Sequence, residues 1–185
     1  MKTLSALLIA LITLLGLSTA SASKAVWNRP YVQSGPGGIF YARCIPKEKL
    51  GSAGFTEIFE VQKEQDKLLD HYDWFAKGGV ILGWSPIAGK VAVMAIHPGT
   101  AAKPDKQVDL SFSLGGKLLK SWTTAELKGL GAEVIHNDYD REDRAIFQTV
   151  ACEQIPNTNE YVFTIQIAAN KKLRFDILTG DIYSK

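Results

Sequence analysis

Cysteine, histidine and clustered charge are scarce in this chain, and each scarcity excludes a class of function. Two cysteines and three histidines in 185 residues, without a CxxC motif, do not supply the usual zinc ligand sets. Lysine and arginine (21) nearly balance aspartate and glutamate (19), and the basic residues are spread along the chain. A nucleic-acid-binding surface normally clusters its basic residues. We therefore expect no metal, no cofactor and no nucleic-acid partner.

The sequence signatures of common catalytic sites are missing as well. There is no GxSxG nucleophile motif, and the glycine-rich stretch Gly35-Pro36-Gly37-Gly38 lacks the GK[ST] ending and the following helix of a phosphate-binding loop. That stretch is therefore expected to form a turn. We assign no catalytic residue and expect a protein without enzymatic activity.

The one long apolar run lies at the N-terminus. It extends from Leu4 to Leu17, follows Lys2, and precedes the small-x-small cleavage pattern of Ala20 and Ala22. It is shorter than the roughly 20 apolar residues that cross a bilayer. We predict a cleavable signal peptide over residues 1–22, with cleavage before Ser23 preferred to cleavage before Lys24; an uncleaved single-span anchor is the alternative. Residues 23–185 then form one β-rich domain without a membrane span, exported to the periplasm or the extracellular space.

Cys44 and Cys152 are the only cysteines. Export would place them in an oxidising compartment, where disulfides form and persist. We predict a Cys44–Cys152 disulfide that closes a long loop, which contributes about 4 to 5 kcal/mol in the chain-entropy model. Two buried free thiols are the alternative.

Short apolar segments with the period of strands fill the rest of the chain. Apolar residues alternate in the first two of these segments and form short runs in the others: 39–45, 56–61, 79–82, 91–96, 108–114, 118–122, 145–151, 161–168, 172–177 and 181–183. Turn residues such as Gly115-Gly116 separate them. One short helix is expected at Thr123–Gly129, where Thr123 and Glu126 have the spacing of a capping box. The pattern predicts an all-β, antiparallel domain, either a propeller-like meander or a two-sheet sandwich.

A strand–turn–strand pattern recurs at 59–69, 112–119 and 175–182. Separately, five motifs, at 34–41, 56–61, 82–91, 116–122 and 175–180, resemble in their order those of exported bacterial proteins of unassigned function. The resemblance implies a propeller-like β meander and carries no catalytic residues. Because the spacings are uneven and the domain would supply at most about four blades, the two-sheet sandwich stays open.

The most polar stretch is HNDYDREDR at residues 136–144. Asp138, Asp140 and Glu142 have the alternating spacing with which a calcium-binding loop begins. The glycine at the sixth position and the glutamate at the twelfth are absent, and His136 is the single imidazole. We predict a solvated connector whose carboxylates pair with the neighbouring arginines; the alternatives are a weak or partner-dependent ion site, a protein-binding epitope and a catalytic acid.

Two further features have candidate roles. His71 and Asp73 would share one face of a strand, as an imidazole–carboxylate general-base pair requires, but no nucleophile motif accompanies them. A hydrogen-bonded histidine is therefore expected.

Trp27, near the predicted mature N-terminus, is the tryptophan expected to be exposed, and could take part in a sugar-stacking platform.

The favoured hypothesis is an exported, non-enzymatic binding or inhibitory module that acts on another secreted protein or an envelope component. Its candidate binding residues are Trp27, His71, Asp73, His136, Asp138 and Asp140. The alternative is a hydrolase-like or glycan-binding protein that uses the same residues. Geometry separates the two hypotheses, because an enzyme would gather His71, Asp73 and His136 or Asp138 in one concave pocket.

Overall fold

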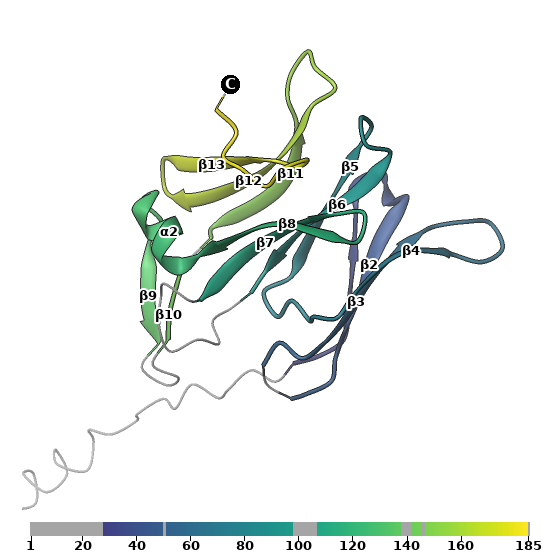
Figure 1. The fold of residues 1–185 in the computed structure, drawn as a ribbon, viewed down its shortest axis with the longest axis horizontal. Coiled ribbons are helices and arrows are strands. Elements are labelled where there is room, and N and C mark those ends of the chain that lie inside the picture. Colours follow the sequence, from purple (N-terminus) through teal and green to yellow (C-terminus); the bar gives the residue numbers. More distant parts are fainter. Residues whose placement is uncertain (1–27, 50, 98–106, 138–141, 146, 185) are drawn as a thin grey trace, which may run out of the picture.

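The computed structural model describes residues 28–49, 51–97, 107–137, 142–145 and 147–184 (Figure 1). These residues form thirteen strands, one short α-helix and one 3-10 turn, so the predicted all-β class is confirmed. The elements, in chain order, are β1 (Tyr31–Ser34), η1 (Pro36–Gly38), β2 (Phe40–Pro46), β3 (Gly54–Glu60), β4 (Lys67–Tyr72), β5 (Val80–Ser85), β6 (Lys90–Ile96), β7 (Val108–Leu114), β8 (Lys117–Thr123), α2 (Thr124–Gly129), β9 (Val134–Asn137), β10 (Glu142–Ala145), β11 (Thr149–Gln154), β12 (Tyr161–Ala168) and β13 (Lys171–Asp176). Within these residues, no helix has the length and apolarity needed to cross a bilayer.

Most strands belong to three antiparallel meanders, in which neighbouring strands follow one another along the chain. We call them sheet I (β1–β4), sheet II (β5–β8) and sheet III (β11–β13). An isolated bridge between Phe175 and Ile182 adds the beginning of a fourth strand to sheet III. Strands β9 and β10 form a separate hairpin.

The three strand–turn–strand patterns of the sequence occupy equivalent places in these sheets. They are the connection from β3 to β4, the connection from β7 to β8, and the turn from β13 to the bridge at Ile182. In the second pattern Gly115 and Gly116 have φ values of 54° and 79°, which glycine adopts without steric cost. The repeated sequence pattern therefore marks the last hairpin of each meander.

Sheet II lies in the middle and buries both of its faces. On β5, Val80 and Leu82 belong to a cluster shared with sheet I, while Ile81 packs against a cluster shared with sheet III. On β6 the alternation continues, with Val93 on the first side and Met94 on the second. Because adjacent side chains of a strand point to opposite faces, these near-continuous apolar runs join two cores.

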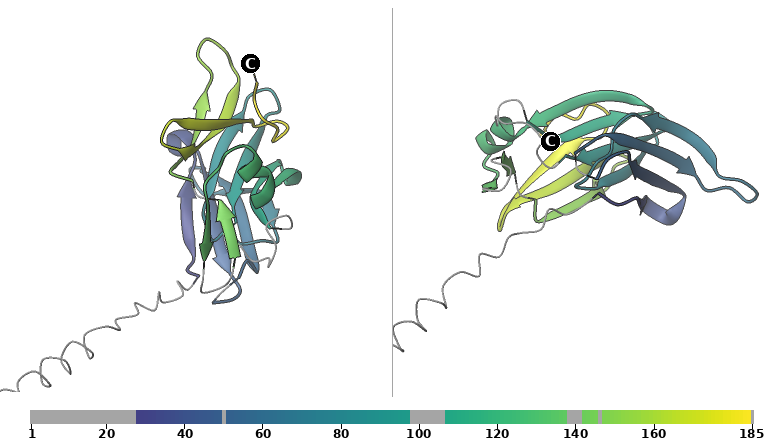
Figure 2. Two further views of the ribbon diagram at one scale, coloured as in Figure 1. Left: turned by 90° about the vertical axis from the view of Figure 1, so that its left-hand side faces the viewer. Right: turned by 90° about the horizontal axis from the view of Figure 1, so that it is seen from below.

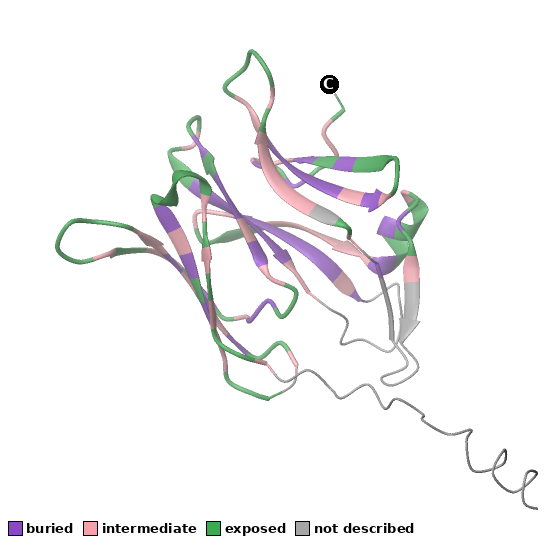
Figure 3. Cartoon of the chain, turned by 180° about the vertical axis from the view of Figure 1, so that it is seen from behind, coloured by how far each residue is buried: buried purple, intermediate pink, exposed green. Residues whose placement is uncertain are grey.

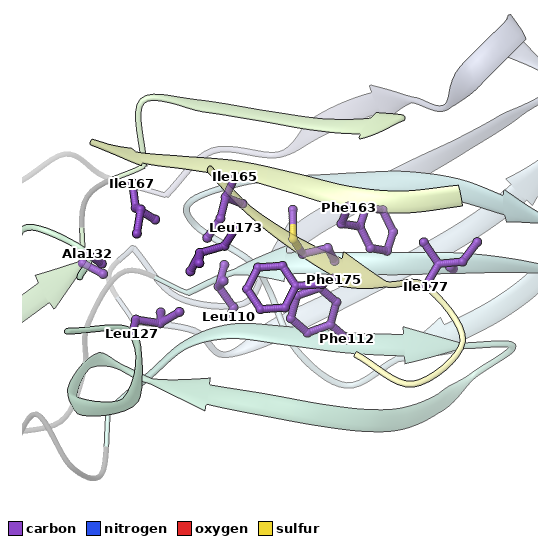
Figure 4. Close-up of a cluster of buried hydrophobic side chains, with 13 residues drawn as sticks. Leu110, Phe112, Leu127, Ala132, Phe163, Ile165, Ile167, Leu173, Phe175 and Ile177 are labelled. Atoms are coloured by element: carbon purple, nitrogen blue, oxygen red, sulfur yellow. The ribbon is translucent and has the colours of Figure 1, made fainter. Parts of the chain in front are cut away.

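Figure 4 shows the larger core, between sheets II and III, where aromatic rings from three strands meet. The ring of Phe112 on β7 lies 5.9 Å from that of Phe163 on β12 and 4.8 Å from that of Phe175 on β13. All three side chains are buried. Leu127 of α2 covers one end of this core.

The strands that begin each sheet lie closest together. Strand β5 contacts β1 and β2 of sheet I as well as β11 and β12 of sheet III. The later strands of the three sheets spread apart, so the molecule is an open fan rather than a closed barrel (Figure 2). This arrangement confirms the predicted antiparallel all-β meander, which is built here from three sheets.

Helix α2 starts with the predicted capping box. The amide of Glu126 donates to Thr123 Oγ1 (3.2 Å), and the amide of Thr123 donates to the Glu126 carboxylate (2.7 Å). These reciprocal hydrogen bonds satisfy two backbone donors at the helix start.

The predicted Cys44–Cys152 disulfide is wrong, because both cysteines are free. Cys44 on β2 is buried in the core between sheets I and II, where Thr56 Oγ1 lies 3.6 Å from its sulfur. Cys152 on β11 packs on the opposite face of sheet II, against Gly83. Sheet II therefore separates the two thiols.

We predict that Phe112→Ala lowers the free energy of unfolding by about 3 to 5 kcal/mol, because it leaves a cavity between sheets II and III. Leu118→Ala is the control, since the side chain of Leu118 is 64% exposed and its removal should change stability by less than about 0.5 kcal/mol. Chemical denaturation measures both. Equal losses in the two variants would contradict the position of the core.

Candidate functional site

The structure places the predicted site residues in different parts of the molecule. Trp27, Asp138 and Asp140 lie outside the described residues. His136 belongs to β9, where its backbone pairs with Asp143 of β10. This hairpin lies beside α2, whereas β4 with His71 lies at the other end of the longest axis (Figure 1). The solvated-connector role of residues 136–144 stays a prediction.

His71 and Asp73 are brought together, as their spacing predicts. His71 Nε2 lies 3.3 Å from Asp73 Oδ1, and His71 Nδ1 lies 3.6 Å from Glu57 Oε1. The Arg43 guanidinium continues the row, because its Nε donates to Glu57 Oε2 at 3.0 Å. The register of sheet I produces this row, since Glu57 pairs with Arg43 on one side and with His71 on the other.

This charged row is open to solvent. The side chains of His71 and Asp73 are 46% and 91% exposed, and the imidazole ring stacks on Phe55 with centroids 5.8 Å apart. Both ring nitrogens of His71 face carboxylates. A hydrolase places its general base within hydrogen-bonding reach of a nucleophile, in a concave site that holds the substrate. The row has the geometry of a surface ion-pair ladder instead.

Aromatic and aliphatic side chains lie beside the charged row on the same face of sheet I, which points away from sheet II. Tyr41 and Phe59 are cross-strand partners whose rings stack with centroids 5.2 Å apart, and Arg43 lies over Phe59 at 5.1 Å. Leu68 pairs with Phe59, and Val32 pairs with Arg43; they are 49% and 65% exposed. We call this surface the outer face of sheet I.

The outer face of sheet III has a different chemistry. There the Thr164 hydroxyl donates to Glu153, and the Gln166 amide donates to Gln148. Lys172 and Arg174 on β13 are exposed (Figure 3). The exposed side chains of this face are polar, while Val162 and Thr164 on the same face are buried. The two ends of the stack therefore differ.

Other potential sites are weak among the described residues. No group of three or more histidine, cysteine or acidic side chains could hold a metal ion there. A shallow depression exists at the β11–β12 turn, but a single stretch, 154–159, lines it, without titratable side chains. Burial raises the pKa of the Cys152 thiol to about 11, which opposes reactivity as a thiolate.

His97 is a partner of Ser111 that the sequence analysis missed. The Ser111 hydroxyl and His97 Nε2 lie 2.7 Å apart on the face of sheet II that packs on sheet I, and the imidazole meets the edge of Trp74 at 5.7 Å. Ser111 is only 6% exposed, so this serine–histidine pair cannot reach a substrate. His97 follows one apolar run of the sequence and Ser111 lies in the next. Only the register of the two strands, which the sequence does not show, places the two side chains in contact.

Comparison of the chain with protein-family models, with curated protein sequences and with solved structures finds no match.

We predict that His97 makes stability pH-dependent. Burial lowers the pKa of His97 from its ordinary value of 6.5 to about 4. Between these values the unfolded chain binds a proton that the folded protein excludes. The free energy of unfolding should therefore fall by about 2 to 3 kcal/mol as the pH decreases across that interval.

The matched variant is His97→Gln, which keeps an acceptor for Ser111 but does not titrate. Denaturant unfolding at several pH values between 7 and 4 should show a smaller loss of stability in the variant than in the wild type. The same pH dependence in both proteins would show that His97 is not the titrating group.

Proposed function

We propose that this chain is an exported, non-enzymatic binding module that holds a protein partner on the outer face of sheet I. The observation that carries the proposal is the contrast between the two ends of the stack. Sheet III ends in a polar face, whereas sheet I ends in stacked rings and exposed aliphatic side chains. Exposed apolar surface framed by polar groups is typical of protein-interaction sites.

The polar groups of the outer face favour association as well. Arg43 and Glu57 already pair with each other, and His71 lies between two carboxylates. A partner that covers Arg43 and Glu57 leaves neither charge isolated, because these two side chains pair with each other within the sheet. The pairing also holds the side chains in one arrangement before binding, which reduces the entropy lost on association.

Protein binding accounts for the ring geometry better than glycan binding does. A sugar stacks on the open face of an aromatic ring. One face of Phe59 packs on Tyr41 and Arg43 lies over the ring, while Phe55 packs on His71. The rings therefore present mainly their edges, which suit aliphatic and aromatic side chains of a protein.

The hydrolase alternative has less support. His71 and Asp73 form a pair, but they lie on an open sheet face, outside the depression described above. No observation favours a second function over the binding module.

Site-specific photo-crosslinking in cells that naturally express the chain tests the proposal. A benzophenone amino acid is placed at Val32, on the outer face of sheet I, or at Lys172, on the outer face of sheet III. We expect discrete protein adducts from position 32 and none from position 172, because the partner occupies one face only.

Adducts of equal yield from both positions, or adducts from position 172 alone, would contradict the proposed docking face. Fractionation of the same cells tests export, which should recover the chain outside the cytoplasm with its N-terminus at Ser23.

A further inference from the structure

One hairpin of this basic chain carries a net negative charge. Residues 54–73, which contain β3 and β4, carry six carboxylates and two lysines, a net charge of −4 in a chain whose net charge is +2. The rest of the chain carries a net charge of +6 as a whole, although residues 133–143, which lie partly outside the described residues, form a second acidic stretch with five carboxylates and one arginine. Segregation of this kind creates a local field that selects a partner of opposite sign.

Some of the six carboxylates are neutralised inside the protein, and the others remain available. Glu57 pairs with Arg43, and half-buried Asp70, whose pKa is raised by desolvation, lies near Lys90. The remaining four are arranged along the β3–β4 turn and after β4: Glu60, Glu64, Asp66 and Asp73. Only two lysines, at positions 63 and 67, oppose them in the hairpin.

The same hairpin carries exposed apolar side chains. Val61 and Leu68 are both 49% exposed, and Phe59 lies between the Tyr41 ring and Leu68 on the outer face of sheet I. The Tyr41 hydroxyl donates to Asp66 at 2.8 Å, which joins the aromatic stack to the acidic turn. Figure 1 shows the turn between β3 and β4 projecting from the body of the molecule, and Figure 3 shows that it is exposed.

We propose that the outer face of sheet I and its acidic β3–β4 hairpin bind a cationic, amphipathic polypeptide segment. The aliphatic side chains of that segment contact Phe59, Val61 and Leu68, and its lysine or arginine side chains reach the carboxylates of the turn. Apolar contact and charge attraction act together here, because the two kinds of group alternate along one hairpin.

A second copy of this chain fits the site less well. The exposed basic residues on β13 could meet the acidic turn, but the exposed side chains around them are polar, so this face offers no exposed aliphatic side chain to Phe59 and Leu68. Self-association is therefore an outcome of the test rather than the proposal.

The inference rests on the proposed function and specifies its partner.

The test uses three fluorescein-labelled synthetic peptides of equal length, with alternating leucine–lysine, leucine–glutamate or serine–lysine sequence. Fluorescence anisotropy with the mature, full-length chain measures their binding. The leucine–lysine peptide should bind at least about tenfold more tightly than either of the others, and added salt should weaken its binding.

Variants locate the binding surface. Glu60→Gln/Glu64→Gln and Leu68→Ser should each weaken binding of the leucine–lysine peptide about fivefold. The matched controls, Glu48→Gln/Glu133→Gln and Leu118→Ser, remove the same groups elsewhere and should leave binding unchanged. Circular dichroism and unfolding midpoints verify that every variant is folded.

Three results would overturn the inference: no binding of the leucine–lysine peptide, equal binding of the leucine–glutamate peptide, or equal losses in hairpin variants and controls. Dimerisation of the chain that excludes the peptide would assign the face to a second copy. If position 32 still gives protein adducts while the leucine–lysine peptide fails to bind, the docking face stands and the partner chemistry is wrong. If position 32 gives no protein adducts and the leucine–lysine peptide does not bind, both proposals are wrong.

Discussion

The burial of sheet II on both faces is the constraint on which the rest of the structure depends. A sheet with one apolar face needs one neighbour, but β5 and β6 are apolar on both sides and need two. Sheet I covers one face and sheet III covers the other. The close approach of β11 also depends on Gly83, where a Cβ atom would lie 2.7 Å from the sulfur of Cys152. Any side chain at that position would push the sheets apart.

A stack built in this way ends in two sheets that each have one uncovered face. The chain gives these faces opposite character. The exposed side chains on the outer face of sheet III, such as Lys172 and Arg174, are polar, and the Gln166 amide is hydrogen-bonded. The outer face of sheet I carries the Tyr41–Phe59 stack and exposed Val32 instead. The functional proposal follows from this difference, since a surface of that kind gains more from a partner than from solvent.

Local features of the fold could be predicted from the sequence, because they depend on neighbouring residues. Alternating apolar residues indicated strands, glycine pairs indicated hairpins, and Thr123 with Glu126 indicated the start of the helix. The His71–Asp73 contact belongs to the same class, since residues two apart share a strand face.

Features that depend on register and on the order of layers could not be predicted. The pairing of Arg43 with Glu57 and that of His97 with Ser111 both require the alignment of separate strands. The disulfide prediction failed for the same reason. Composition and compartment favoured a bond, but nothing in the sequence shows that Cys44 and Cys152 lie on opposite faces of sheet II.

Native-state hydrogen exchange, followed by mass spectrometry across increasing denaturant, tests the central role of sheet II most directly. Because β5 and β6 contribute to the burial of both cores, their amides should exchange last, and sheets I and III should lose protection together with them in one cooperative transition. Two separate transitions, with sheet I unfolding while sheets II and III stay protected, would show that the middle sheet does not join the two cores into one unit.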